Sequence, residues 1–228
     1  MFKKVITLSS NSAWYLFNFR SSTIKKFINE GFNVVCICPE GSYVKDLILL
    51  GCDWKNININ RKGTNPLSDL LIFCRFLMLY LKIRPIAAFH FTIKNNIYGT
   101  LAASLVRVKS INNITGLGTT FINKNFTTFV VLFLYRLSQP LAKTVFCQNP
   151  DDQNFIIEKK IAIPAKVKLL AGSGINLKKI HPSLKRDLPI DRVFRFLFAG
   201  RLLGDKGLNE LIEALKHVNK DNIQCHIW

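Results

Sequence analysis

The chain has 228 residues, of which 49% are hydrophobic and 20% are charged. This composition excludes a disordered chain, which would be poor in apolar residues. Its 12 glycines, 8 prolines and 6 cysteines are too few for a collagen-like protein or a disulfide scaffold. The length fits one large domain, or one domain and part of another.

The charge is strongly basic. Lys and Arg number 32 and Asp and Glu number 14, which gives a formal net charge of +18. Both halves of the chain share this excess, so the body is basic and there is no separate basic tail. A basic body favours anionic partners, namely nucleic acid, an anionic membrane surface or phosphorylated substrates. Charge alone does not choose among them.

No membrane or export segment is expected. The first apolar run, Val5–Leu8, is too short for a secretory signal. No uninterrupted apolar run reaches the roughly 18 residues of a spanning helix. The cysteines do not have the spacing of a zinc site. We therefore expect buried, reduced thiols in a cytoplasmic protein.

Short apolar runs alternate with longer helical patterns along the first 170 residues. The expected strands are Lys4–Leu8, Asn33–Cys38, Trp54–Ile59, Ile86–His90, Ser110–Asn113 and Thr144–Cys147. The expected helices are Tyr15–Glu30, Tyr43–Leu50, Pro66–Lys82, Asn96–Val106, Phe126–Leu141 and Pro150–Ile161. This alternation predicts an α/β domain with a parallel, doubly wound sheet. Gly31 and Gly51 each follow a helix, where a left-handed residue is useful.

The pattern changes after a further strand, Val167–Leu170. Residues 171–192 are rich in Gly, Ser, Pro and Lys, which suits a linker. A strand at Phe194–Ala199, a helix at Leu208–Val218 and another strand from Ile223 follow. These three elements cannot close a core alone. We therefore expect a first domain over 1–170, a linker over 171–192 and an incomplete second domain over 193–228.

Candidate site residues follow from the rule that ligands bind at the carboxyl ends of strands in an open parallel sheet. His90 ends the fourth strand, where it can act as a base or bind a hydroxyl. A structural histidine is an equal alternative. Lys94 is a candidate for a phosphate at a helix start, or else a solvated lysine. The glycines at 116 and 118 allow a ligand close to the backbone, although a tight turn explains them equally well.

No dinucleotide-binding or Walker A pattern is present, and we expect neither a metal nor a cofactor. A stronger local signal runs from Gly200 to Gly207. A strand delivers Gly200 and Arg201 to its carboxyl end, and a loop then places Lys206 at the start of a helix. Two cations beside a helix N-terminus suit a diphosphate.

Phe198–Gly207 resembles the donor-phosphate motif of retaining nucleotide-sugar glycosyltransferases of glycosyltransferase family 4, which have the GT-B fold. The resemblance implies that Gly200, Arg201, Lys206 and Gly207 hold the donor diphosphate. Leu170–Asn176 resembles the stretch that links the two domains in that family, with Ala171 replacing Pro and Asn176 replacing Asp. The family implies two Rossmann-like domains, of which the first binds the acceptor and the second the donor.

A subgroup of that family, which serves capsule, O-antigen and lipid-linked oligosaccharide assembly, is more similar still. Its similarity rests on Ser12–Arg20, Asn60–Pro66, Thr92–Gly99, Asn113–Gly118 and Gln148–Asp152. The candidate acceptor-binding residues within these segments are Asn18, Arg20, Lys94, Asn96, Tyr98, Thr115 and Gly116. The resemblance covers essentially the whole chain and is specific for fold and reaction class, but not for the sugar.

The function implied is a hexosyl transfer, with retention, from a nucleotide-sugar such as a UDP-sugar. The acceptor is a polyprenyl-diphosphate-linked sugar or another glycan at the cytoplasmic face of the inner membrane. The Phe126–Leu137 stretch then docks on anionic lipid, or instead packs on the sheet. The family's second domain continues further and carries a Glu-x7-Glu motif, which this sequence lacks. We therefore expect a C-terminally truncated form with an incomplete donor site, inactive by itself.

Two other functions remain to be weighed. The first is a non-catalytic module that binds the acceptor or the membrane. The second is nucleic-acid binding, which follows from charge alone and has no motif to support it. We expect no nucleic-acid partner.

Overall fold

The structure is a computed structural model that describes residues 4–59, 65–116, 126–177, 193–200, 202, 204–218 and 223–227. The chain divides into two compact units, Met1–Asn176 and Leu177–Trp228. No helix in the described parts of the chain is long and apolar enough to cross a membrane. All six cysteines are free thiols.

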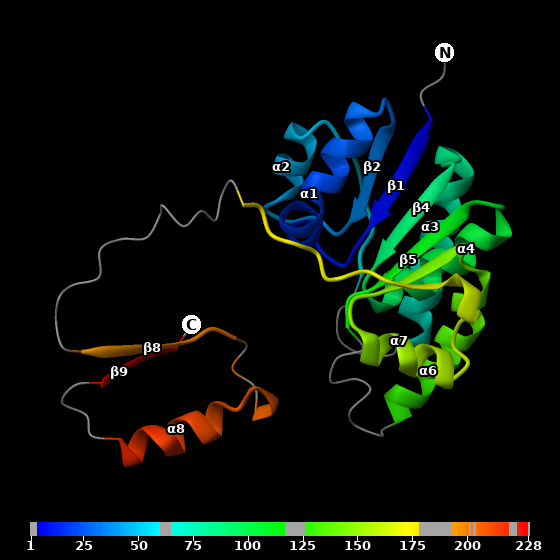
Figure 1. Cartoon of the computed structure of the whole chain (residues 1–228). Coiled ribbons are helices and arrows are strands. Elements are labelled where there is room, and N and C mark those ends of the chain that lie inside the picture. Colours follow the sequence, from blue (N-terminus) through cyan, green and yellow to red (C-terminus); the bar gives the residue numbers. More distant parts are fainter. Residues whose placement is uncertain are drawn as a thin grey trace. The chain divides into compact units, whose positions relative to one another are not determined.

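A seven-stranded parallel sheet forms the centre of the first unit (Figure 1). Its strands are β1 (Val5–Ser9), β2 (Asn33–Cys38), β3 (Asp53–Asn56), β4 (Ala87–Phe91), β5 (Lys109–Ile114), β6 (Thr144–Cys147) and β7 (Val167–Leu169). Their order is β3-β2-β1-β4-β5-β6-β7, and every neighbouring pair is parallel. The predicted α/β class is confirmed.

Helices cover both faces of this sheet (Figure 1). On one face α1 (Ala13–Asn29) and α2 (Val44–Leu49) pack over a cluster that includes Leu8, Leu16 and Leu47. The other face carries α3 (Pro66–Ile83), α4 (Thr100–Leu105), α6 (Phe126–Ser138) and α7 (Pro150–Glu158). Burial on both faces explains why the strands are continuous apolar runs.

Local capping explains where several helices begin and end. The side chains of Ser12, Asn65 and Asn149 accept hydrogen bonds from the first turns of α1, α3 and α7. Each such cap stabilises a helix by about 1 kcal/mol. Gly31 and Gly51 have φ of 84° and 96°, so the left-handed residues predicted after two helices are confirmed.

The predicted helix Asn96–Val106 is divided. It begins as a π-helical turn, η1 (Asn95–Gly99), and continues as α4. Thr92, just before it, has φ of 73°, a strained conformation for a β-branched residue. Gly99 packs so closely on His90 that a Cβ would lie 2.6 Å from its ring. The junction between β4 and α4 is therefore tightly constrained.

The second unit contains β8 (Phe194–Phe198), the short 3-10 turn η5 (Gly204–Lys206), α8 (Leu208–His217) and β9 (Ile223–Ile227). β8 and β9 form a two-stranded parallel sheet. None of the unit's described residues is buried, so they enclose no hydrophobic core.

Candidate functional site

The strand order creates a topological switch point between β1 and β4. From β1 the chain proceeds outward through β2 to β3, and then returns to place β4 on the other side of β1. Connections on either side of that point lie on opposite faces of the sheet, which leaves a crevice at the carboxyl ends of the two strands. Ligands of open α/β sheets bind in this crevice.

Arg20 lies at this crevice. It belongs to α1, which follows β1, and its guanidinium carbon is 4.4 Å from the centroid of the Phe91 ring at the end of β4. Nη2 of Arg20 donates a hydrogen bond of 2.8 Å to the hydroxyl of Tyr15. Only 6% of Arg20 is exposed. A charged side chain is therefore held almost inside the domain.

A row of hydrogen bonds extends from Arg20 across the neighbouring strand ends. Nη2 of Arg20 also donates to Oγ of Ser173, at 3.2 Å. Nε2 of Gln148, just after β6, donates to Oγ of Ser173 at 3.3 Å and to Oδ1 of Asn113 in β5 at 3.2 Å. The carboxyl edge of the sheet thus presents a continuous polar row from α1 to the segment after β7.

The charge of Arg20 is not balanced within the described residues. No described carboxylate forms an ion pair with it. Its Nε is buried without a hydrogen-bond partner. Burial raises the pKa of Tyr15, against the opposing effect of the Arg20 charge, so the phenol supplies no negative charge at neutral pH. A buried cation without a counter-charge is costly, and an anionic ligand would balance it.

Three further candidates, Asn18, Thr115 and Gly116, do not join this row. Thr115 and Gly116 directly follow β5, and Gly116 has φ of 120° with open space where a Cβ would stand. Asn18 is exposed on α1, where its side-chain amide donates to the carbonyl of Trp14 at 2.9 Å. These positions leave Thr115 and Gly116 accessible at the carboxyl edge.

The candidates that follow β4 already have partners inside the protein. Nζ of Lys94 lies 2.7 Å from Oδ1 of Asp69, and the hydroxyl of Tyr98 donates to Oδ2 of the same carboxylate at 2.8 Å. The amide of Asn96 donates to the backbone carbonyl of Asn113 at 3.1 Å. Lys94, Asn96 and Tyr98 therefore help to hold η1 in place.

His90 has an interior environment. It is fully buried, and its Nδ1 lies 2.9 Å from Oδ1 of Asn112. Because that oxygen accepts, Nδ1 carries the proton, and Nε2 accepts from the Tyr80 hydroxyl at 2.7 Å. Burial lowers the pKa of His90 to about 4, although Asn112 opposes the shift. The environment fits the structural alternative, since neither nitrogen is available to a substrate.

The predicted donor site is described only in part. Lys206 is the last residue of η5 and is exposed. Gly207 follows it as the N-cap of α8 and has φ of 73°. Gly200 follows β8, while Arg201 lies outside the described residues. Two parts of the segments that resemble the family, Asn60–Thr64 and residues 117–118, also lie outside the described residues. The donor diphosphate site stays a prediction.

The sequence patterns did not indicate that Tyr15, Phe91, Asn113, Gln148 and Ser173 belong to one site. Two signals pointed to this edge: Gln148 directly follows a predicted strand, and Asn113 is a polar residue at a strand end. Nothing local signals that Ser173 meets Arg20, because the contact joins positions 153 residues apart.

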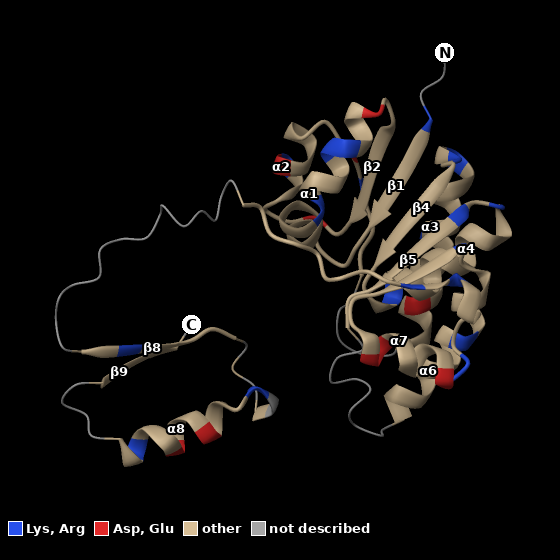
Figure 2. Ribbon diagram, viewed as in Figure 1, with Lys and Arg blue, Asp and Glu red and all other residues tan. Residues whose placement is uncertain are grey.

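The other charged residues of the first unit can be followed along its elements. Lys and Arg are scattered over several elements of the first unit (Figure 2). Among the described residues, no group of three or more His, Cys, Asp or Glu is arranged to hold a metal ion. Among the described residues of this edge, the buried guanidinium of Arg20 is the charged group without an ion-pair partner.

The fold is shared with solved glycosyltransferase structures. Anabaena Alr3699/HepE, solved in complex with UDP and glucose, matches with a TM-score of 0.70 and 15% identity over 99% of this chain. The chain spans only 61% of the HepE chain. A glycosyltransferase from Rickettsia africae matches with a TM-score of 0.63 and 16% identity, over 100% of this chain and 69% of its own.

The fold by itself does not distinguish transfer from epimerisation. A UDP-N-acetylglucosamine 2-epimerase from Rickettsia bellii also matches, with a TM-score of 0.59 and 12% identity over 99% of this chain and 69% of its own. No curated protein sequence matches the chain significantly.

The sequence of the first unit assigns the chain to a family. Residues 4–149 match the profile of the family described as glycosyl transferase 4-like. This match covers the sheet from β1 to β6, including Arg20 and the crevice between β1 and β4. The first unit is thus a Rossmann-like domain of the GT-B type, and the chain belongs to the glycosyl transferase 4-like family.

Proposed function

We propose that this chain is part of a retaining glycosyltransferase that moves a sugar from a nucleotide-sugar, in particular a UDP-sugar, to a polyprenyl-diphosphate-linked or other glycan acceptor. Family membership supports the reaction class. The fold likeness to HepE, which was solved with UDP and with UDP-glucose, supports a uridine nucleotide as the donor. Assembly of a surface polysaccharide such as capsule or O-antigen is the proposed setting.

Buried Arg20 is the observation that carries the acceptor assignment. It lies at the switch point of the first unit, and no described carboxylate balances its charge. In our proposal the donor diphosphate belongs to Arg201 and Lys206 in the second unit. The anion left for Arg20 is then the diphosphate of the acceptor. A guanidinium suits this role because it keeps its positive charge at all physiological pH values and donates N–H groups to phosphate oxygens.

The proposed chemistry breaks the bond between the sugar C1 and the oxygen of the nucleoside diphosphate. An acceptor hydroxyl forms the new bond to C1 on the same face and passes its proton to the departing diphosphate, which leaves as the nucleoside diphosphate. Arg201 and Lys206 stabilise the negative charge that develops on the leaving diphosphate. His90 has no step in this scheme, because both of its ring nitrogens are engaged. We further propose that the reaction uses no metal or cofactor.

The membrane setting is also part of the proposal. A lipid-linked acceptor places the reaction at the cytoplasmic face of an inner membrane. The net charge of +18 favours peripheral contact with anionic lipids there. The protein would reach this surface from the cytoplasm.

A second candidate is a non-catalytic module that binds the acceptor or the membrane. One observation favours it: the described residues of the second unit, where the donor would bind, enclose no hydrophobic core. Such a unit gives little pre-organisation to a donor site. In this alternative the first unit retains its anion site and its lipid contact.

A paired titration separates the two candidates. The purified chain is titrated with a panel of UDP-sugars by calorimetry, and its flotation with phosphatidylglycerol vesicles is measured in parallel. Transfer is then assayed with the radiolabelled UDP-sugar that binds best and a membrane lipid extract. Donor binding together with labelled lipid product supports the transferase. Vesicle binding without donor binding supports the module and contradicts a catalytic role for this chain.

A further inference from the structure

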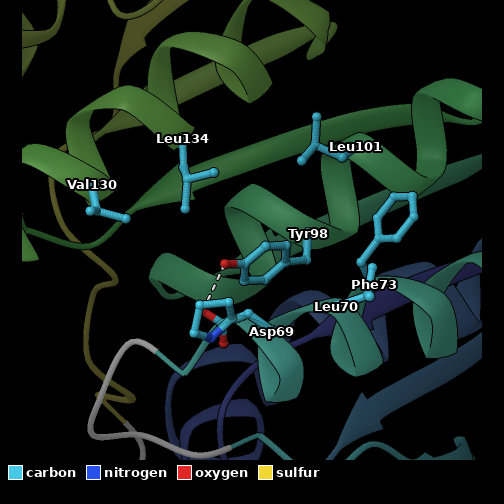
Figure 3. Close-up of a pocket in the computed structure, with 8 residues that line it drawn as sticks. Asp69, Leu70, Phe73, Tyr98, Leu101, Val130 and Leu134 are labelled. Carbon is cyan, nitrogen blue, oxygen red and sulfur yellow. Dashed lines mark hydrogen bonds between the residues drawn. The ribbon is translucent and has the colours of Figure 1, made fainter.

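A groove of about 440 Å³ lies between α3, α4 and α6 on the outer side of the first unit (Figure 3). Side chains of α6 face those of α3 and α4 across it (Figure 3). Its apolar lining consists of Pro66, Leu70, Phe73, Leu101, Val130 and Leu134. A volume of this size is within the range of small-molecule sites.

The polar atoms in the groove are already used. Asp69 and Tyr98 complete the lining, and they are hydrogen-bonded to each other at 2.8 Å. The remaining oxygen of Asp69 is paired with Lys94 at 2.7 Å. A polar ligand would find few free partners here, so the groove fits a hydrocarbon group.

The helices beside the groove carry large apolar side chains on their outer surfaces. Phe126 is 80% exposed and Leu67 is 74% exposed. Leu71, Phe129 and Phe133 are also more than half exposed. Their spacing of three or four residues gathers them along one face of α3 and one face of α6. Contiguous exposed apolar faces of this kind mark interaction surfaces.

Charge on these two helices favours an anionic lipid surface. Their basic residues are Arg75, Lys82 and Arg136, all exposed. Their acidic residue is Asp69, whose charge Lys94 compensates. An apolar face bordered by cations and lacking free carboxylates complements the headgroup and acyl boundary of an anionic membrane.

The groove also begins at the sheet edge that carries Arg20. Pro66 and Asp69 are in the first turn of α3, which follows β3, and Tyr98 is in η1, which follows β4. In a parallel sheet the helices start at the carboxyl edge, where the strands end. Arg20 is on α1 and the groove is on the opposite face of the sheet. A ligand with an anionic head and a long hydrocarbon tail would therefore have to pass around this shared edge to use both features.

We propose that this groove binds the isoprenoid chain of the lipid-linked acceptor while the outer faces of α3 and α6 lie on the membrane. The inference rests on the proposed function for the identity of the acceptor lipid. The groove supplies the site for the tail, and Arg20 supplies the site for the diphosphate. Bound in this way, the tail helps to select lipid-linked acceptors over free sugars.

A chain-length series tests the groove. The full chain is titrated by calorimetry with inorganic phosphate, geranyl phosphate and farnesyl phosphate, below the concentrations at which they form micelles. Because the headgroup is constant, differences report the tail. Each buried methylene can raise affinity up to about fourfold. We expect farnesyl phosphate to bind with one-to-one stoichiometry and at least tenfold tighter than geranyl phosphate.

Two tryptophan substitutions on α6 form a matched pair. Val130→Trp fills the groove with apolar bulk and should weaken farnesyl phosphate binding at least tenfold. Thr127→Trp adds the same side chain at an exposed position of α6 outside the groove. It should change the affinity for farnesyl phosphate less than twofold. Circular dichroism and thermal unfolding establish that both variants fold.

Three outcomes would overturn the inference. The first is that farnesyl phosphate binds no tighter than inorganic phosphate, and the second is that Val130→Trp leaves farnesyl phosphate binding unchanged. The third is that dodecyl phosphate binds as tightly as farnesyl phosphate and is also weakened by Val130→Trp. The groove would then be a general acyl-chain site and not an isoprenoid site. The proposal that Arg20 binds the diphosphate fails in a different way. In that case Arg20→Met leaves inorganic phosphate binding unchanged, while the affinity for the prenyl phosphates still depends on chain length.

Discussion

Nη2 of Arg20 and Oγ of Ser173 are 3.2 Å apart, although 153 residues separate them in the chain. This hydrogen bond links α1, which follows β1, to the segment that follows β7. Gln148 donates to the same hydroxyl at 3.3 Å. The start of the segment that leads to the second unit is therefore anchored on the polar row that we assign to the acceptor.

Burial of His90 predicts a specific loss of stability in acid. Its pKa of about 4 lies below the ordinary value of 6.5, so the unfolded chain binds a proton that the folded chain does not accept. Stability is then complete above pH 6.5 and decreases as the pH falls toward 4. Between pH 7 and pH 5 the loss from this residue is about 2 kcal/mol.

Urea unfolding of the wild-type chain and of His90→Gln at both pH values checks this. The loss of unfolding free energy between pH 7 and pH 5 should be smaller in His90→Gln by about 2 kcal/mol. An NMR titration of the His90 ring provides a second test that does not depend on a variant. An imidazole that titrates near pH 6.5 in the folded protein would contradict the buried, neutral assignment.

Gly99 should tolerate no side chain, because a Cβ there would lie 2.6 Å from Cδ2 and Nε2 of His90. The ring is held by Tyr80 and Asn112 and cannot move aside without breaking a buried hydrogen bond. We expect Gly99→Ala to lower the free energy of unfolding by about 1–3 kcal/mol. Gly41→Ala, where nothing lies within 4 Å, is the control and should be nearly neutral. Equal stability of the two variants in chemical denaturation would refute the close packing.

Loss of the Asp69 carboxylate should lower the free energy of unfolding more than loss of the Lys94 ammonium, because Asp69 joins α3 to η1. Asp69→Asn leaves the ammonium of Lys94 without its counter-charge in a site where only 16% of its side chain is exposed. We expect a loss of about 2 kcal/mol in unfolding free energy. Lys94→Met in that background removes the unpaired charge and should restore part of the loss. Strictly additive effects in this double-mutant cycle would mean that the pair is not coupled.

Sequence patterns predicted the first unit well because its strands are buried on both faces. Continuous apolar runs such as Asn33–Cys38 have no other stable place than the interior of a parallel sheet. Capping residues such as Asn149 fixed the helix starts. The strand near Trp54 is shorter than expected, ending at Asn56, although Ile57 and Ile59 beyond it are still buried. Burial alone therefore overestimated its length.

The side-chain partners could not be predicted in the same way. Lys94 was a candidate phosphate ligand because it precedes a helix, but Asp69, 25 residues earlier, occupies it. His90 ends a strand as expected, yet Tyr80 and Asn112 satisfy it from two other elements. Such contacts depend on how α3, β4 and β5 pack, which no local pattern encodes. Arg20 is the acceptor candidate whose charge no described carboxylate balances.

Pyrophosphate binding to the wild-type chain, Arg20→Met and Arg20→Lys tests the central claim most directly, with unfolding measured on the same samples. We expect saturable binding to the wild type and a loss of at least tenfold in Arg20→Met. Arg20→Lys should recover only part of the affinity, since an ammonium lacks the two-pronged geometry of the guanidinium. Arg20→Met should also be as stable as the wild type, because it removes a buried charge that no described carboxylate balances. Unchanged pyrophosphate affinity in Arg20→Met, together with a large loss of its stability, would make Arg20 a structural residue and contradict the account.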